Sequence, residues 1–561
     1  MRTAPDMPSD LEISRRAVLR PMAEIARAAG IPAEALEPYG RHKAKVDPLL
    51  VPPRSTRGQV VLVTAMSPTP AGEGKSTVTV GLGDALAKAG ANTVIALREP
   101  SLGPVLGLKG GAAGGGYSQV VPMEDINLHF TGDFHAITTA NNALTALLDN
   151  HIYQGNLLGI DPRRITFRRV MDMNDRSLRD IVIGLGGPTQ GTPRQDGFDI
   201  TVASEIMAVF CLARDLADLK ARLARITVGY TYDRQPVTVA DLGIEGALTL
   251  LLKDAIKPNL VQTLAGTPAL VHGGPFANIA HGCNSVIATE LARTVADVVV
   301  TEAGFGADLG AEKYMDIKAR AADVAPDAVV LVATIRALKM HGGVPRTELG
   351  GPNPAALEAG TANLARHIAN IRKFGVEPVV AVNRFPTDTQ DEMDWLLGWC
   401  RTQGVQAAAA DVWAQGGGGP GGDELAALVL AALREPVDFH HLYPLELPVA
   451  EKIRTVAREI YGADDVEFSP QALRRLAEIT AGGWDSLPVC MAKTQYSFSD
   501  NAALLGAPSG HTLHVRDLIL KTGAGFVVAL TGAVMTMPGL PKTPAALAMD
   551  VSPDGTPQGL S

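Results

Sequence analysis

A strand, a glycine-rich loop and a helix follow one another between residues 60 and 90, and this order constrains the fold most strongly. The apolar run Val60-Val61-Leu62-Val63 leads into Thr69-Pro70-Ala71-Gly72-Glu73-Gly74-Lys75-Ser76-Thr77, and an amphipathic segment continues to about Gly90. Such a loop directs backbone N–H groups and the positive end of a helix dipole at an anion. The pattern predicts a phosphate-binding loop that contacts ATP.

Two side chains in this loop are suited to phosphoryl chemistry. Lys75 can reach the terminal phosphates of a nucleotide, and the Ser76 hydroxyl can ligate Mg²⁺. The usual pattern, G-x-x-x-x-G-K-[ST], has glycine where this chain has Thr69. A glycine-rich turn that binds no phosphate is the alternative, but Gly-Lys-Ser in register between strand and helix favours nucleotide. The residues expected at ATP are Thr69, Pro70, Ala71, Gly72, Glu73, Gly74, Lys75, Ser76 and Thr77.

Short apolar runs recur along the chain, and most end at polar or glycine-rich segments. They lie at residues 93–97, 199–202, 269–271, 298–300, 328–332 and 378–382. Continuous apolar runs of this length are typical of parallel strands that are buried on both faces. Ligands bind at the carboxyl ends of such strands. The pattern predicts an α/β fold with a mostly parallel sheet and one composite site.

Arg98 directly follows the run at 93–97, next along the chain after the phosphate-binding unit. A guanidinium grips a carboxylate or phosphate with a planar fork that lysine cannot reproduce. We therefore expect Arg98 to be catalytic together with Lys75. An ion pair with a neighbouring carboxylate is the structural alternative.

Composition narrows the class of protein. The 561 residues carry a net charge of −9, with 46% hydrophobic and 19% charged residues, which describes a globular enzyme without a broad nucleic-acid surface. The four cysteines are far apart and form no C-x-x-C motif, so we expect reduced, mostly buried thiols and a cytoplasmic location. No apolar run is long enough to span a bilayer.

Acidic residues near the expected site raise the question of a cation. The glycine-rich segment 109–117 could approach a ligand or form a mobile loop, and the segment 122–133 after it ends at Asp133. Hard cations prefer oxygen ligands, so Glu99 and Asp133 suit Mg²⁺ or a monovalent cation better than zinc. A solvated loop with one capping aspartate is the alternative.

Two aromatic residues each follow an apolar run, Phe385 after 378–382 and Trp413 after 410–412. Aromatic rings in loops above a sheet can clamp a flat heterocycle by stacking. From the residues alone, loop-anchoring core positions are the more common explanation.

Several long blocks resemble the formate–tetrahydrofolate ligase family, also called formyltetrahydrofolate synthetase. Besides the phosphate loop, they are residues 98–104, 109–133, 276–282, 301–314, 336–343, 383–388, 491–497 and 535–541, and they span nearly the whole chain. Thr69 is normal for that family, and Ser76, where many members have threonine, keeps the hydroxyl.

The resemblance implies a function and a set of ligands. It implies ATP-dependent joining of formate to tetrahydrofolate through formyl phosphate, with Mg-ATP and a monovalent cation (K⁺ or NH₄⁺) as cofactors. It also implies that Phe385 and Trp413 stack on the pterin, that the folate can be polyglutamylated, and that the protein is a homotetramer. A switch ATPase that regulates a protein partner would share the phosphate loop but would not need Arg98 or the aromatic pair. A third alternative is a small-molecule kinase that releases its phosphorylated product.

The resemblance and the strand pattern together suggest three domains. We expect a large P-loop α/β domain over residues 1–365, with a core like that of the nitrogenase iron protein. A second α/β domain, 366–500, would contribute the folate-stacking loops, and a small C-terminal domain would cover 501–561.

Overall fold

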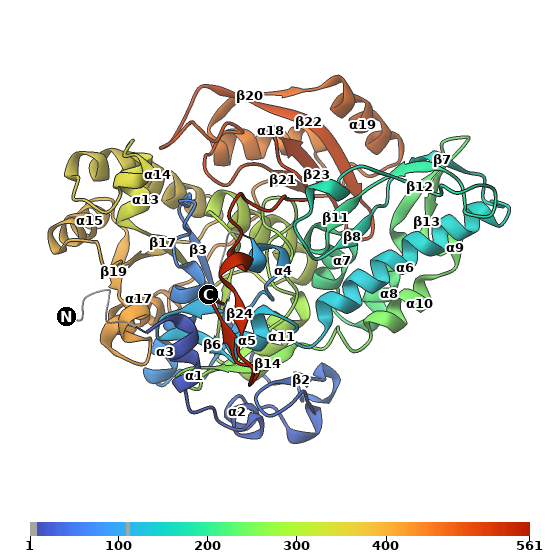
Figure 1. Ribbon diagram of the computed structural model, residues 1–561. Helices are drawn as coiled ribbons and strands as arrows, with labels where there is room; N and C mark the ends of the chain where they lie inside the picture. The colour runs from blue at the N-terminus through green and yellow to red at the C-terminus, as the bar shows by residue number, and fades with distance from the viewer. Residues whose placement is uncertain (1–7, 108–112, 561) are drawn as a thin grey trace.

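The computed structural model describes residues 8–107 and 113–560, and its centre is a large mixed sheet (Figure 1). Within the described residues the sheet has twelve strands, and the seven from β15 to β19 in its spatial order all pair in parallel, which confirms the mostly parallel α/β expectation. In spatial order the strands are β1 (Leu36–Pro38), β2 (Ala44–Val46), β14 (Asn259–Thr263), β15 (Pro268–Val271), β4 (Thr93–Leu97), β16 (Val298–Glu302), β3 (Gln59–Ala65), β17 (Ala328–Ala333), β18 (Pro378–Asn383) and β19 (Gln406–Ala410), with β5 (Gly114–Gly115) and β6 (Ser118–Val121) beside β14.

The central strands are apolar at successive positions because helices cover both faces of the sheet. In β3, Val61 and Val63 pack into a core with helices α3 (Lys75–Lys88) and α17 (Asp423–Ala432). Val60 and Leu62 point to the opposite face, into a core with α13 (Ile335–His341) and α14 (Pro354–Arg372). Successive side chains of a strand point to opposite faces, so a strand buried on both must be apolar throughout.

The apolar run at 199–202 does not join this sheet. Its first residues belong to β11 (Phe198–Ile200), which pairs in parallel with β8 (Arg169–Met171) in a separate two-stranded sheet, and a 3-10 helix (Thr201–Ala203) follows. The apolar side chains there instead face a second core that includes helix α7 (Glu205–Leu212). Burial against helices, rather than sheet pairing, explains this run.

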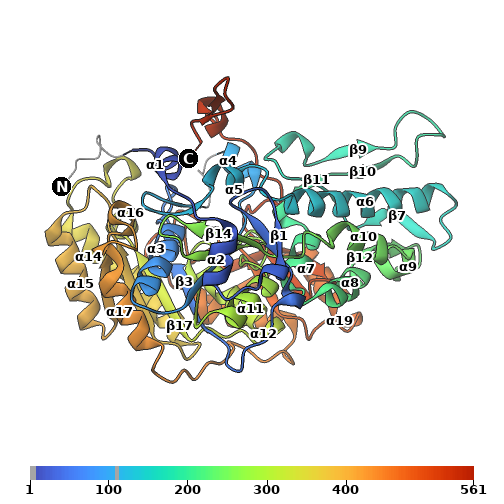
Figure 2. The same ribbon diagram turned by 90° about the horizontal axis from the view of Figure 1, so that it is seen from below.

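Two smaller layered parts flank the large sheet. At the top of Figure 1, β20 (Ala463–Phe468), β22 (His511–Lys521), β23 (Phe526–Thr531) and β21 (Val489–Ala492) form a four-stranded sheet beside helices α18 (Val449–Val456) and α19 (Pro470–Ala481). At the right of both views, the long helix α6 (Asp133–Tyr153) lies beside α8 (Leu216–Arg225), α10 (Glu245–Leu252) and the strands β7 (Ile160–Ile165), β12 (Thr227–Thr231) and β13 (Pro236–Thr238) (Figure 2).

The expected boundary between residues 365 and 366 falls inside helix α14, and β18 and β19 beyond it continue the large sheet. The first two expected domains therefore share one sheet. All four cysteines are buried and free, as predicted. Within the described part of the chain, none of the helices combines the length and apolar character of a membrane span.

Candidate functional site

A cavity of about 470 Å³ lies where β3, β4 and β16 end, at the carboxyl edge of the parallel strands. It brings together residues 70–77 of the predicted phosphate loop with Arg98 and Glu99, whereas Phe385 and Trp413 are not among its lining residues. Other lining residues come from further segments of the chain: Asp10, Pro100, Ser101, Pro104, Val105, Gly114, Gly274, Phe276, Ala277, Gly304 and Phe305.

The phosphate loop has the backbone geometry of an anion site. Helix α3 begins at Lys75, and its N-cap Gly74 has a left-handed φ of 68° and no side chain that could cap the first N–H groups. A Cβ at Gly74 would lie 2.4 Å from Asn383 Nδ2, so only glycine fits this position. The uncapped N–H groups and the helix dipole make the start of α3 attractive to phosphate.

The buried Glu73 side chain stabilises the conformation of the phosphate loop. Its Oε1 accepts a 2.6 Å hydrogen bond from the Thr69 N–H, and its Oε2 accepts one from the Thr334 hydroxyl at the end of β17. Asn383 Nδ2, at the end of β18, donates to the Glu73 carbonyl over 2.9 Å. The loop is therefore tied to the ends of two neighbouring strands before any ligand binds.

Three side chains converge on Glu302, the last residue of β16. Lys75 Nζ lies 3.0 Å from Glu302 Oε2, the Ser76 hydroxyl donates to the same oxygen over 2.8 Å, and Arg98 Nη2 lies 3.5 Å from Oε1. Burial by itself would raise the pKa of Glu302, but Lys75 and Arg98 outweigh it and lower that pKa to about 2. Burial is also the main cause that lowers the pKa of Lys75, with Glu302 opposing it. Glu302 is therefore a buried carboxylate anion that holds both cations.

Arg98 is only loosely bound by its neighbours. Besides the contact with Glu302, its Nη1 donates to the Pro275 carbonyl over a long 3.4 Å, and its buried Nε meets no hydrogen-bond partner among the described residues. A buried guanidinium N–H without a partner is costly. A small anion in the cavity would satisfy it.

Glu99 and Asp133, the two residues predicted for a cation, differ in the partners of their carboxyl groups. Asp133 Oδ1 receives a 2.7 Å ion pair from buried Lys45, and its Oδ2 accepts a 2.7 Å hydrogen bond from Asn259. Burial and the nearby Asp133 charge raise the pKa of Glu99 well above its usual range, and its Oε2 has no partner in the described residues. Among residues 8–107 and 113–560, no group of three or more His, Cys, Asp or Glu side chains could hold a metal ion.

The two predicted stacking residues flank the phosphate loop instead of lining the cavity. Phe385 follows β18, and a Cβ at Gly74 would lie 4.0 Å from its Cζ. Trp413 lies in the short helix α16 (Val412–Gln415), which follows β19, and its carbonyl accepts a 2.9 Å hydrogen bond from the Tyr117 N–H. Both rings are half-buried.

The glycine-rich segment is partly described. Residues 109–112 of the segment 109–117 lie outside the described residues. Gly116 has a left-handed φ of 57°, and a Cβ there would lie 2.1 Å from the Trp413 carbonyl oxygen. Its N–H donates to Asp10 Oδ1 over 2.8 Å. Glycine at 116 is thus required by close packing against Trp413.

Sequence reasoning missed Glu302 and Arg336. Glu302 ends an apolar strand, a position where functional residues are common, and this was a usable signal. Its partners Ser76 and Lys75, however, are 226 and 227 residues away. Arg336 lies in helix α13, and its guanidinium stacks over the Phe385 ring. No local pattern predicts that contact.

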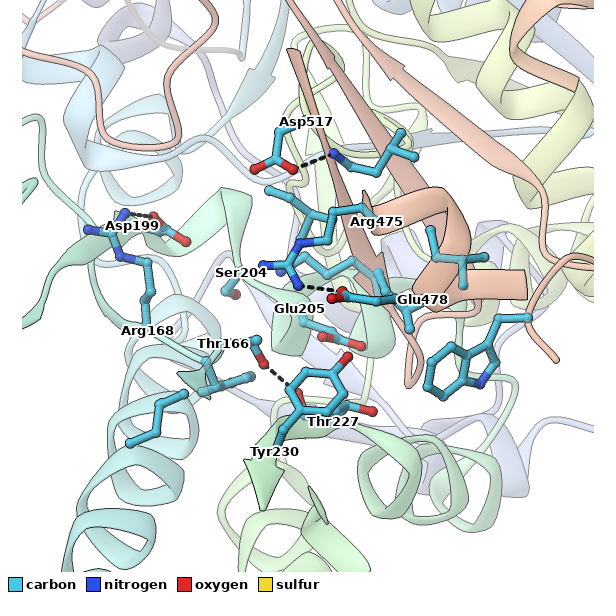
Figure 3. A pocket seen from close by; sticks show the side chains of 18 of the residues that line it. Thr166, Arg168, Asp199, Ser204, Glu205, Thr227, Tyr230, Arg475, Glu478 and Asp517 are labelled. Atoms are coloured by element: carbon cyan, nitrogen blue, oxygen red, sulfur yellow. Dashed lines mark hydrogen bonds and ion pairs between the residues drawn. The ribbon is translucent and has the colours of Figure 1, made fainter. Parts of the chain in front are cut away.

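A second cavity, of about 220 Å³, lies apart from the phosphate loop between β12, α19 and β22 (Figure 3). Figure 3 shows two ion pairs among its lining residues: Arg475 lies 2.7 Å from Glu478, and Arg168 lies 3.4 Å from Asp199. These charges are therefore neutralised by partners within the protein. The first cavity, with its loosely bound arginine and uncapped helix, is the better candidate site.

Comparisons with known proteins give a consistent result. A family model described as "Formate--tetrahydrofolate ligase" matches residues 8–561. The formate–tetrahydrofolate ligase of Arthrobacter sp. (strain FB24) is 74% identical over 557 residues, 98% of this chain and 99% of the relative. That of Renibacterium salmoninarum is 73% identical, with 99% of each chain covered. That of Staphylococcus aureus (strain NCTC 8325) is 63% identical, over 98% of this chain and 99% of the relative.

Proposed function

The chain belongs to the formate–tetrahydrofolate ligase family, and we propose that the cavity at the ends of β3, β4 and β16 is where it joins formate to tetrahydrofolate. The reaction consumes ATP and gives 10-formyltetrahydrofolate, ADP and phosphate. The observation that carries the assignment is the convergence of Lys75, Ser76 and Arg98 on Glu302. The names of the relatives give no support to a switch ATPase.

In the proposed mechanism, ATP places its phosphates at the start of α3, against the loop at residues 69–77. Lys75 leaves Glu302 and neutralises the phosphoryl group in transfer, because such transfer needs positioning and charge neutralisation above all. The Ser76 hydroxyl and the Glu302 carboxylate are oxygen ligands that fit Mg²⁺. When bound, the metal neutralises phosphate charge. An acidic residue on the strand next to the loop strand is the arrangement of P-loop NTPases, which supports a P-loop core like that of the nitrogenase iron protein.

Arg98 holds formate in this proposal. A formate oxygen attacks the γ-phosphorus, ADP leaves, and the product is formyl phosphate, a mixed anhydride. The folate N10 amine then attacks the formyl carbon, phosphate leaves and N10 gives up its proton. The guanidinium, whose Nε has no hydrogen-bond partner among residues 8–107 and 113–560, suits formate and then the anhydride. Water has to be kept from the anhydride, since it would otherwise hydrolyse it.

Phe385 and Trp413 are proposed to stack on the pterin, since both lie half-buried beside the loop. A monovalent cation, a homotetramer and a polyglutamate tail on the folate stay predictions. Of the two residues predicted for the cation, Glu99 has one oxygen without a hydrogen-bond partner in the part of the chain that the structure describes, whereas Lys45 and Asn259 already occupy Asp133.

The test is ADP formation with each substrate omitted in turn. The proposed route predicts full turnover only with ATP, formate and tetrahydrofolate together. ADP release at the full rate from ATP and formate without folate would instead indicate a kinase. ATP hydrolysis that ignores formate would contradict the assignment of Arg98.

A further inference from the structure

Arg336 connects two parts of the site that bind different substrates in the proposed function. Its guanidinium carbon lies 3.7 Å from the centroid of the Phe385 ring. At this distance the guanidinium covers one face of the ring, an arrangement that combines stacking with cation–π attraction. Only the other face of Phe385 can then stack on a ligand.

The same guanidinium also binds the phosphate loop. Its Nη2 donates to the Gly72 carbonyl, and its Nε lies 3.6 Å from Glu73 Oε2. Gly72 has a left-handed φ of 79°, so the direction of its carbonyl is set by the backbone turn of the loop. The Phe385 ring and the turn of the loop therefore share one cation.

The neighbourhood of Arg336 makes this link stiff. Asn383, two residues before Phe385, donates to the Glu73 carbonyl over 2.9 Å. The Arg336 side chain is about one-fifth exposed and rises from helix α13, whose N-cap Thr334 also donates to Glu73. The ring and the loop are thus joined through stacked and hydrogen-bonded groups.

We propose that Arg336 is a positioning residue that couples folate binding at Phe385 to the ATP-binding loop. The inference rests on the proposed function, in which Phe385 stacks on the pterin. A pterin on the open face fixes the ring, the ring fixes the guanidinium, and the guanidinium fixes the Gly72 carbonyl. Coupling between sites is reciprocal, so tetrahydrofolate should tighten nucleotide binding and nucleotide should tighten folate binding by the same factor.

The experiment measures that factor by calorimetry without formate, so that no turnover occurs. The Kd of a nonhydrolysable ATP analogue with Mg²⁺ is determined with and without saturating tetrahydrofolate. We expect tightening of at least about 5-fold in the wild type, and less than about 2-fold in Arg336→Lys and Arg336→Gln. Lysine keeps the charge but lacks the planar fork that stacks and donates together. Arg454→Lys is the matched control, since Arg454 lies 5.4 Å over the ring of Phe468 in the C-terminal part.

A purely structural role gives a different result. If Arg336 only supports the loop, both Kd values rise and their ratio stays as in the wild type, which overturns the proposal. Absence of tightening in the wild type also overturns it. Phe385→Leu separates the hypothesis that Phe385 stacks on the pterin from the hypothesis that Arg336 couples the two sites. An unchanged folate Kd in Phe385→Leu overturns the stacking role of Phe385 and, with it, the coupling. A raised folate Kd in Phe385→Leu, together with wild-type coupling in Arg336→Lys, overturns the coupling alone.

Discussion

Lys75 Nζ lies 3.0 Å from Glu302 Oε2, so the cation expected at the phosphates is held by a buried carboxylate in this structure. The Lys75 side chain is 12% exposed and that of Glu302 is 2% exposed. A nucleotide must therefore replace one partner of an existing ion pair. The pair keeps the lysine in the cavity when the phosphates are absent.

Replacement of Lys75 tests the phosphate-loop assignment. We expect Lys75→Ala to lose about 3–4 kcal/mol of transition-state stabilisation, a fall in kcat of about 10²–10³ or more. Steady-state kinetics measures this, with circular dichroism to establish that the variant is folded. Lys88→Ala is a control on the same helix, since Lys88 pairs with exposed Asp423. A kcat like that of the wild type in Lys75→Ala would remove the argument from the loop.

The depressed pKa of Glu302 predicts how stability changes with pH. Because the folded value is about 2 and the ordinary value is 4.5, the ionised carboxylate contributes about 3 kcal/mol at neutral pH. That contribution is fully present above the unfolded pKa and is lost as pH falls from about 4.5 toward 2. We expect the stability advantage of the wild type over Glu302→Gln, measured by urea unfolding, to shrink by about 2 kcal/mol between pH 6 and pH 3. An advantage independent of pH would contradict the pairing.

Arg98 is expected to determine the use of formate. Arg98→Lys keeps the charge but loses the fork, so kcat/KM for formate should fall by about 10²-fold while the KM for ATP changes little. Initial rates over a formate series and an ATP series measure the two effects separately. Equal losses for both substrates would show that Arg98 acts on the nucleotide instead.

Trp413 is expected to act on folate. Trp413→Ala should raise the KM for tetrahydrofolate, because stacking is worth about 0.5–1.5 kcal/mol beyond area burial. Trp484→Ala is the matched control, since that half-buried tryptophan lines the second cavity. A raised KM for ATP with an unchanged KM for folate would assign Trp413 to the nucleotide.

The sequence predicted local units well and long-range pairing poorly. The order strand, loop and helix at 59–88 follows from periodicity and glycine placement, so Lys75 and Ser76 could be located in advance. Arg98 was within reach because it follows the next strand along the chain. Glu302 also ends an apolar strand, but its pairing with Lys75, Ser76 and Arg98 was out of reach, since it depends on β16 lying between β3 and β4, a strand order that no local pattern specifies.

The same limit bears on two other predictions. Asp133 was predicted as a cation ligand from its residue type, but Lys45, on a short strand 88 residues away, occupies it. The expected boundary at 365–366 depends on whether β18 and β19 extend the sheet beyond β17, which no local pattern in the sequence specifies. In both cases the deciding contact joins segments that are distant along the chain.

The Lys45–Asp133 pair separates a structural role from a cation-binding one. Both side chains are 1% exposed and 2.7 Å apart, and removal of one partner from a buried pair leaves an uncompensated charge. We expect Asp133→Asn to lower the free energy of unfolding by about 3–5 kcal/mol. Where K⁺ activates the enzyme, as the family resemblance implies, the K⁺ concentration for half-maximal activation should stay unchanged in the folded variant. Asp254→Asn is the control, because the exposed Lys253–Asp254 pair should contribute less than about 1 kcal/mol. A several-fold higher K⁺ requirement with little loss of stability would instead make Asp133 a cation ligand and require Lys45 to move away from it.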